Sequence, residues 1–308
     1  MPMFDVISIG ATTVDILVKP EEMVLEKEWL KIERSSKSEI GKWLICSGGG
    51  ASNSAVAMRR LGLKSACVSQ AGKDLLREYI NRDLDEEKVD RTMMAVARKE
   101  GTDFSVILVS YEGSRSILVK RGKERLEERD IRWGKIKKTK WFYISSLEGN
   151  MDLLEKLIGA ALENGIKVAV NPGNRELKQR GRLIPLLSQV DFLLLNKAEA
   201  EILTEKKMKE ERFWKRLMSF GAKIIAVTNG RKGAHVIERE KHIFSPIINT
   251  KVMDETGAGD AFGSAVVAGL IYGKRIEEAL EWGMKNSASV VRFLGAKEGL
   301  LKINKLIN

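Results

Sequence analysis

The segment VMDETGAGDAFG, residues 252–263, places three glycines and two aspartates just before the apolar run AVVAGLI at 265–271. Small residues let a backbone turn tightly and bring its N–H groups close to a ligand. The first turn of a helix adds free N–H donors and a partial positive charge. The segment therefore predicts an anion-binding loop at the start of a buried helix.

The aspartate inside this loop needs an explanation, because a carboxylate repels a bound phosphate. Asp260 makes sense there if it accepts a proton. The two common phosphate-binding motifs are excluded: a dinucleotide motif needs a glycine where Phe262 stands, and the chain has no G-K-S or G-K-T triplet for a P-loop. Considered alone, the loop could also be a turn that only caps a helix.

Length and composition predict a globular protein. The chain has 308 residues, 44% of them apolar, which is enough for one extended core. No apolar run approaches the roughly 18 residues that cross a bilayer, and the N-terminus does not read as a signal peptide. Cys46 and Cys67 form no C-x-x-C pattern, so we expect reduced thiols, no zinc and a cytoplasmic location.

The chain is basic, with 53 Lys and Arg against 42 Asp and Glu and a net charge of +11. Many of the basic residues lie between 115 and 140. Nucleic-acid binding is disfavoured because no known module is present and aromatic residues make up only 6%. We therefore expect neither nucleic acid nor a membrane as a partner, and interpret the basic excess as solvated surface.

Strand and helix patterns alternate along the chain, which favours a mainly parallel sheet covered by helices on both faces. Residues 20–46 are too polar for a central strand and too apolar for a linker, so a small peripheral sheet is expected there. With no linker or repeat, one continuous domain over 1–308 is predicted. The strand candidates are 4–10, 66–69, 104–109, 117–119, 141–144, 167–170, 190–195, 224–228 and 234–237, and the helix candidates are 51–61, 152–163 and a segment from about 198.

The loop D-x-T-G-A-G-D-A-F, together with GGGASNSAVAMRRLG at 48–62, resembles both signatures of the ribokinase-like (PfkB) carbohydrate kinase family. The resemblance runs through nearly the whole chain. It implies a three-layer α/β/α fold with a small β-rich lid, built from about 16–46 and 96–121. Further matching landmarks, in chain order, are Asp15, Gly72-Lys73-Asp74, Asn171-Pro172-Gly173-Asn174-Arg175, LNKAEAE at 195–201 and TNGRKGA at 228–234.

The resemblance implies an ATP-dependent phosphotransferase that acts on the hydroxymethyl group of a sugar or a related small alcohol. Asp260 matches the family's catalytic base, and the N–H groups of Gly257, Ala258 and Gly259 match its anion hole. Removing the acceptor's proton and neutralising phosphate charge are the two tasks of such a reaction.

The same resemblance assigns binding residues. Asp15 would grip a sugar diol, because a carboxylate accepts two hydroxyl hydrogen bonds, and Gly48, Gly49 and Asn53 would complete the acceptor site. The implied nucleotide-binding residues are Asn196, Thr228, Gly230, Gly233 and Asn286.

Metal sites are also implied. Glu199 would hold Mg²⁺ through water, since magnesium keeps much of its hydration. Asp254 and Thr256 stand where some relatives bind a monovalent cation such as K⁺. For Asn196 and Glu199 a simple capping box at a helix start stays open as the alternative, and the basic residue expected near the phosphates cannot be chosen among Lys197, Arg175 and Arg231.

One departure bears on the acceptor: Arg121-Gly122-Lys123 replaces the G-A-N sequence common near the lid. If these side chains face the substrate, they favour a sugar acid or phosphosugar; surface charge is the alternative. A nucleoside kinase of the same fold is the main rival function. A non-catalytic sugar or nucleotide sensor is disfavoured, because a binding protein needs no proton acceptor beside an anion site. The sequence leaves open whether the lids of two copies pair into a homodimer.

Overall fold

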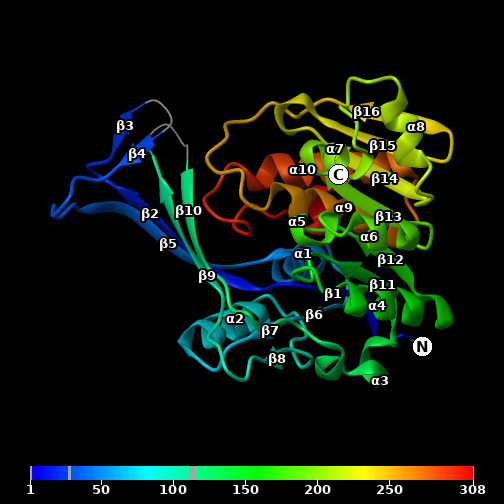
Figure 1. Cartoon of the computed structure of the whole chain (residues 1–308), viewed down its shortest axis with the longest axis horizontal. Helices are drawn as coiled ribbons and strands as arrows, with labels where there is room; N and C mark the ends of the chain where they lie inside the picture. The colour runs from blue at the N-terminus through cyan, green and yellow to red at the C-terminus, as the bar shows by residue number, and fades with distance from the viewer. Residues whose placement is uncertain (1, 27–28, 111–114, 308) are drawn as a thin grey trace.

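The computed structural model describes residues 2–26, 29–110 and 115–307. Figure 1 shows a large sheet flanked by helices, with a smaller sheet extending to one side. Neighbours from β6 to β14 pair in parallel, and β15 and β16 are added antiparallel, which confirms a mainly parallel central sheet. In spatial order the large sheet contains β16 (Lys241–Ser245), β15 (Ala234–Glu238), β14 (Ile224–Thr228), β13 (Phe192–Asn196), β12 (Lys167–Val170), β11 (Thr139–Ile144), β1 (Phe4–Ile9) and β6 (Ser65–Val68).

Helices cover both faces of this sheet, because alternate residues of each strand point to opposite sides. On β11, Phe142 and Ile144 join one core, whereas Trp141 and Tyr143 join the other. The three-layer prediction is confirmed. The first face carries α4 (Met151–Glu163), α5 (Asn174–Leu177), α6 (Arg180–Leu187), α7 (Lys197–Thr204) and α8 (Arg212–Met218), and the second carries α1 (Gly50–Arg60), α9 (Ala258–Ile271) and α10 (Ile276–Val290).

Shorter elements complete the described part of the large layer. Helix α2 packs beside α1 through Ile80 and Leu84. These elements are α2 (Leu75–Glu86), α3 (Trp133–Ile136), the short strands β7 (Gln70–Ala71) and β8 (Ala95–Val96), and the 3-10 turns η1 (Glu128–Asp130), η2 (Gly230–Lys232) and η3 (Ile303–Lys305).

The smaller sheet has the strand order β10-β9-β2-β5 and projects from the body in Figure 1. One of its faces packs Leu17, Ile107 and Val109 near Leu294. Its strands overlap the lid ranges 16–46 and 96–121, of which residues 27–28 and 111–114 lie outside the described residues. The strands are β10 (Arg115–Lys120), β9 (Phe104–Val109), β2 (Thr13–Pro20) and β5 (Ile40–Gly48), with β3 (Val24–Glu26) and β4 (Trp29–Lys31) paired separately.

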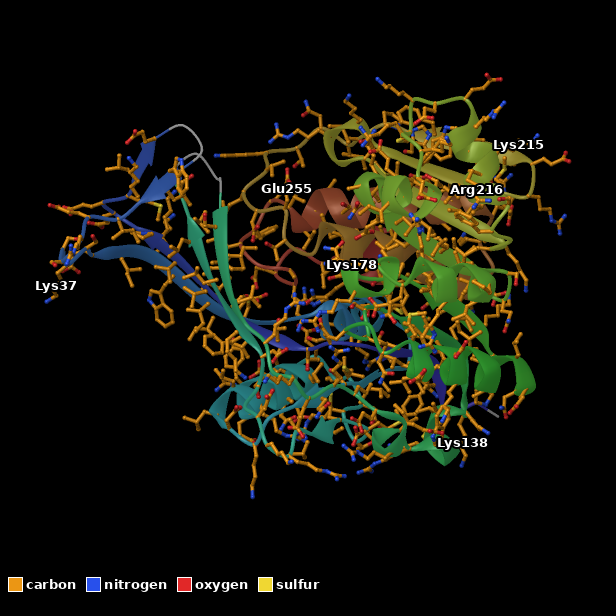
Figure 2. All side chains as sticks on the ribbon, in the orientation of Figure 1. Lys37, Lys138, Lys178, Lys215, Arg216 and Glu255 are labelled. Atoms are coloured by element: carbon orange, nitrogen blue, oxygen red, sulfur yellow. The ribbon has the colours of Figure 1, made fainter. Side chains whose placement is uncertain are left out.

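Basic residues lie on widely separated parts of the surface. Figure 2 shows Lys37 at the outer end of the smaller sheet, Lys138 at the base of the body and Lys215 at its far side. Of the helices in the described ranges, none is both long enough and apolar enough to cross a membrane.

Candidate active site

The first turn of α9 presents backbone donors. Gly257 precedes the helix with φ +76°, a left-handed conformation that favours glycine. The N–H of Ala258 makes only a long bond of 3.3 Å to the carbonyl of Glu255. The N–H groups of Gly259 and Asp260 have no acceptor among the described residues. The loop therefore has the free amides that an anion site requires.

Asp260 points toward α1. Its Oδ2 accepts a hydrogen bond of 2.8 Å from Asn53 Nδ2. Burial raises the pKa of Asp260, while the bond from Asn53 and the positive charge of Lys297 act to lower it. A carboxylate with a raised pKa is a better proton acceptor than an ordinary one, provided that it stays ionised at the working pH.

Asp15 lies inside β2 of the smaller sheet. Its Oδ1 accepts a hydrogen bond from Ser105 on the neighbouring strand β9 and a long one, 3.5 Å, from Thr13. Burial raises its pKa, and the Ser105 bond opposes this. A side chain at Gly48 would collide with Asp15 Oδ2. Ser105 was not found from the sequence, because a strand pattern does not reveal which residue of another strand faces it.

Asn53 carries an unsatisfied polar atom. Its Oδ1 is buried and has no hydrogen-bond partner among the described residues. The turn leading to its helix passes close by: a Cβ built on Gly50 would lie 2.6 Å from Ser145 Cβ and 3.7 Å from Asp260 Oδ1. Gly49 has φ +87°. This glycine turn therefore brings the start of α1 against Asp260.

A cavity of about 470 Å³ opens on the other side of the α9 loop. Its lining includes Ala258 and Gly259 of that loop. Four of the five predicted nucleotide-binding residues also line it, namely Asn196, Thr228, Gly230 and Gly233. Of the three basic candidates, Arg231 lines this cavity.

Asn286, the fifth predicted nucleotide-binding residue, does not line the cavity. It is fully buried, its Nδ2 donates to the carbonyl of Ala261 at 2.8 Å, and its Oδ1 accepts from the N–H of Leu301 at 2.9 Å. Both the Nδ2 and the Oδ1 of Asn286 are therefore hydrogen-bonded to the protein backbone. Met284 and Ser287 of the same helix face the cavity instead.

Asn196 and Glu199 form a capping box at the start of α7. Glu199 N–H donates to Asn196 Oδ1 at 2.9 Å, and Asn196 N–H donates to Glu199 Oε2 at 2.8 Å. The helix-start alternative is thus realised. Burial and the negative charge of Asp260 raise the pKa of Glu199.

Asp254 and Thr256 stabilise the loop before α9. Asp254 Oδ1 accepts from the N–H and the hydroxyl of Thr256, at 2.9 and 2.7 Å, and its Oδ2 accepts from the N–H of Gly295 at 2.9 Å. The loop is thereby tied to the segment after α10. A monovalent cation at this place stays a prediction.

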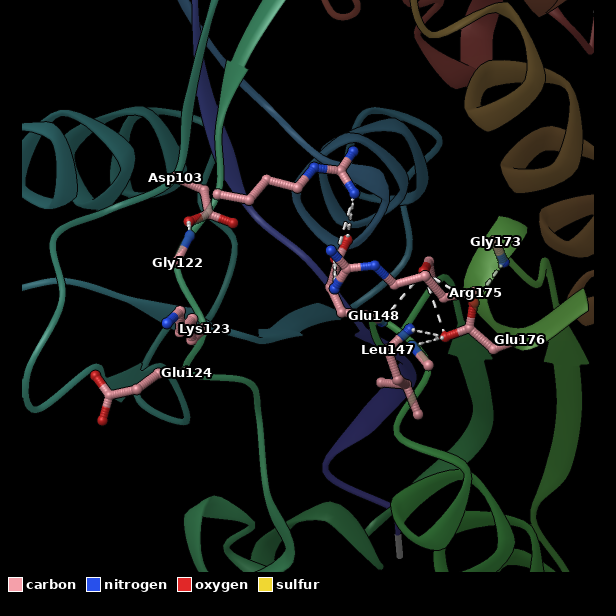
Figure 3. A network of polar contacts seen from close by, with 12 residues as sticks. Asp103, Gly122, Lys123, Glu124, Leu147, Glu148, Gly173, Arg175 and Glu176 are labelled. Carbon is pink, nitrogen blue, oxygen red and sulfur yellow. Dashed lines mark hydrogen bonds and ion pairs between the residues drawn. The ribbon is translucent and has the colours of Figure 1, made fainter. Parts of the chain in front are cut away.

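Two arginines meet on one carboxylate. Arg121 lies 3.1 Å and Arg175 2.9 Å from oxygens of Glu148. Figure 3 shows Arg175 extended toward Glu148. The loop that carries Glu148 is held by buried Glu176, which accepts from the N–H groups of Leu147 and Gly149 at 2.9 and 2.7 Å.

Comparison with known proteins matches residues 3–303 to the family described as pfkB family carbohydrate kinase. Ribokinase of Haemophilus influenzae is 28% identical over 262 residues, which cover 83% of this chain and 84% of the relative. Cytidine kinase of Thermococcus kodakarensis is 26% identical over 304 residues, covering 95% and 98%. The structure of Arabidopsis thaliana ribokinase complexed with ribose and ATP shares the fold, with a TM-score of 0.80 at 22% identity over 99% of this chain and 97% of that one.

Proposed function

The chain belongs to the pfkB family of carbohydrate kinases, and on that premise we propose that it transfers the terminal phosphoryl group of ATP to the hydroxymethyl group of a sugar or sugar-like alcohol. As a member of this family it is an ATP-dependent phosphotransferase with an alcohol group as acceptor. We propose the class of acceptor and the role of each residue at the site.

The observation that carries the proposal is the position of Asp260. It follows Ala258 and Gly259 of the α9 loop, which line the cavity, and its carboxylate accepts a hydrogen bond from Asn53 of α1. Asp260 takes the proton of the acceptor hydroxyl as the new oxygen–phosphorus bond forms. The bond between the terminal phosphorus and its bridging oxygen breaks, and its electron pair leaves with ADP.

The amides of Gly257, Ala258 and Gly259 stabilise the charge on the transferring phosphoryl group. Donors fixed in place before the reaction need no reorganisation in the transition state, which makes their contribution large. The partial positive charge at the start of α9 acts in the same direction. The loop's small side chains leave room for the phosphate to reach the backbone.

We assign ATP to the cavity that Thr228, Gly230 and Gly233 line. Mg²⁺ fits beside this cavity, because the Glu199 carboxylate is bonded to Asn196, a lining residue, and magnesium in such sites is held by one or two carboxylates, water and the phosphates. Glu199 is the carboxylate that we assign to it, through water. When bound, the ion neutralises phosphate charge.

Acceptor binding is assigned to Asp15, Asn53, Gly48 and Gly49. The buried, unpartnered Oδ1 of Asn53 supports this, because a buried polar atom is normally hydrogen-bonded and a sugar hydroxyl would supply the missing donor. Asp15 keeps one oxygen, Oδ2, beside Gly48, where a second hydroxyl can reach it.

The paired arginines favour an anionic acceptor, such as a sugar acid or a phosphosugar. Arg121 and Arg175 bring two positive charges to the single negative charge of Glu148. Glu148 also lines a small cavity with Gly10 and Thr12, near the end of β1; neither arginine is among the residues that line it. A carboxylate or phosphate of the acceptor that reached the two guanidinium groups would bind them with planar, two-pronged hydrogen bonds.

A nucleoside is the second acceptor class to consider, and the cytidine kinase relative is the observation that favours it. The same base and amides would serve a ribosyl hydroxymethyl group. A nucleoside has no carboxylate or phosphate for the arginine pair, so the two classes are separated by acceptor charge.

We propose that a second copy of the chain binds the outer face of the smaller sheet. Trp43 and Leu118 are 66% and 62% exposed there, and Val18 lies opposite Trp43 in the register. A patch of this kind usually marks an interface, and β10 adds a sheet edge that a copy of itself could pair with. Light scattering should give twice the chain mass of 34.5 kDa, falling to one chain in Trp43→Lys/Leu118→Lys; a wild-type mass of one chain would contradict the pairing.

The direct test is a coupled assay of ADP formation with MgATP and a panel of pentoses, hexoses, sugar acids, phosphosugars and nucleosides. We expect turnover with a small set of anionic sugars and slow ATP hydrolysis without acceptor, because an ordered acceptor must complete the site. Turnover with nucleosides alone would support the second class. ADP formation no faster with any acceptor than without one would refute the proposed function.

A further inference from the structure

A buried lysine outside the predicted site reaches the base of the glycine turn. The side chain of Lys297 is only 8% exposed. Its Nζ donates to Ser47 Oγ, to Ser52 Oγ and to Asp83 Oδ2, the last at 2.7 Å. An ammonium group has three hydrogens, so these bonds use all of its donors.

The two serines stand on either side of the turn made by Gly48, Gly49 and Gly50. Ser47 lies near the end of β5, just before Gly48, and Ser52 lies in the first turn of α1. Ser47 also donates to Asp83 of α2. Three consecutive glycines have more conformational freedom than any other tripeptide. The bonds from Lys297 to Ser47 and Ser52 restrain the residues on both sides of these glycines.

The backbone of the same segment reaches the α9 loop. A Cβ built on Gly257 would lie 2.5 Å from Ala296 Cβ, and the N–H of Gly295 donates to Asp254. Residues 295–297 therefore contact the start of the anion-binding loop with their backbone and the glycine turn with the lysine side chain. Nothing in the sequence patterns indicated this connection.

We propose that Lys297 is a positioning residue. Its ammonium group fixes the glycine turn and thereby places Asn53 and Asp260 correctly relative to the acceptor. This inference rests on the proposed function, since it concerns the same acceptor site. The residue that follows Ser52 is Asn53, so a shift of the turn moves the amide that holds Asp260. Errors of about 1 Å in such positions can cost a hundredfold in rate.

The lysine also acts through its charge. It lowers the pKa values of Asp15 and Asp260 against the effect of burial. Among the described residues, Tyr143 and Glu199 also interact with Asp260. Loss of the ammonium therefore keeps Asp260 protonated to a higher pH, a change that a purely structural residue would not cause.

The test compares Lys297→Met and the double variant Ser47→Ala/Ser52→Ala with a matched control, Arg60→Met. Arg60 donates to the carbonyl of Lys297 at 2.7 Å and pairs with Glu87, so it anchors the same segment without reaching the turn. Each purified protein is measured for its thermal midpoint, MgATP Kd, kcat and KM for the best acceptor of the panel, and the pH dependence of kcat.

Lys297→Met should raise the acceptor KM about tenfold or more, lower kcat and move the acid limb of the kcat profile to higher pH, with the MgATP Kd within about threefold of wild type. Ser47→Ala/Ser52→Ala keeps the ion pair with Asp83 and should raise KM without moving the acid limb. Arg60→Met should lose stability but keep its kinetics.

The inference is overturned if folded Lys297→Met has wild-type kinetics, or if Arg60→Met shows the same kinetic changes for an equal loss of thermal stability. Should Lys297→Met not fold, an unchanged KM in the serine double variant overturns it equally. The wild-type control separates the two proposals: an inactive wild type removes the proposed function and this inference with it, whereas an active wild type with a normal Lys297→Met removes this inference alone.

Discussion

The side-chain amide of Asn53 donates a hydrogen bond of 2.8 Å to the carboxylate of Asp260, across 207 positions of sequence. Asn53 lies in the first turns of α1, and Asp260 lies in the first turn of α9. The N-terminal ends of two helices thus converge on one point, and each adds partial positive charge there. An incoming phosphate and an ionised Asp260 are both stabilised by that arrangement.

The pH dependence of turnover tests the state of Asp260. Its pKa is raised by burial, and the base works only when it is ionised. The kcat should therefore fall as pH decreases through a value above that of an ordinary aspartate. In Asn53→Asp a second carboxylate replaces a hydrogen-bond donor, so the acid limb should move to higher pH. An acid limb that stays in place would show that another group titrates.

Asp15→Ala should raise the acceptor KM about tenfold or more, the loss expected for hydrogen bonds to a charged group. The MgATP Kd should stay unchanged, because Asp15 does not line the donor cavity. Asp5→Ala is the matched control: Asp5 is paired with Lys140 at the opposite end of the first strand. Equal KM values in the two variants would count against an acceptor role for Asp15.

Arg121→Gln and Arg175→Gln should each raise KM for anionic acceptors about tenfold or more and leave neutral sugars nearly unaffected. Arg182→Gln, which breaks a surface pair with Asp152 and Glu155, serves as the control. Steady-state kinetics with a matched sugar and sugar acid measure the difference. A uniform loss on both acceptors would contradict recognition of the anionic group.

Neither cysteine should react rapidly with a thiol reagent in the folded protein at neutral pH. Burial raises the pKa of Cys46 and of Cys67 to about 12, so the reactive thiolate is scarce. Both should react once the chain is unfolded in denaturant. Rapid labelling of the native protein would show that these thiols are accessible and ionised.

The alternating strand and helix patterns predicted much of the large sheet, because strands buried on both faces consist of short continuous apolar runs. The bounds of β12 and β14 are those predicted, as are those of β9 in the smaller sheet. The smaller sheet was harder to predict, since its strands carry apolar residues on both faces and many of these are exposed. Asp15 follows the first strand, as expected, and lies inside β2, a strand that was not among the predicted ones.

The site was predictable where function requires a particular backbone. Gly49 and Gly257 have positive φ. Because this conformation favours glycine, such positions can be recognised in the sequence. Partners across the fold leave none: Ser105 beside Asp15 is an ordinary strand serine, and Lys297 is one lysine among many. Asn286 shows the opposite case. Its position in the last long helix implied nucleotide binding, but its side-chain amide is hydrogen-bonded to the backbone of Ala261 and Leu301.

The most direct test of the account is the turnover of Asp260→Asn with the best acceptor of the panel. The substitution keeps the size of the side chain and removes its ability to take a proton. We predict a fall in kcat of about a thousandfold or more, with the MgATP Kd and the thermal midpoint close to wild type. A kcat within about tenfold of wild type would contradict Asp260 as the base and, with it, the proposed mechanism.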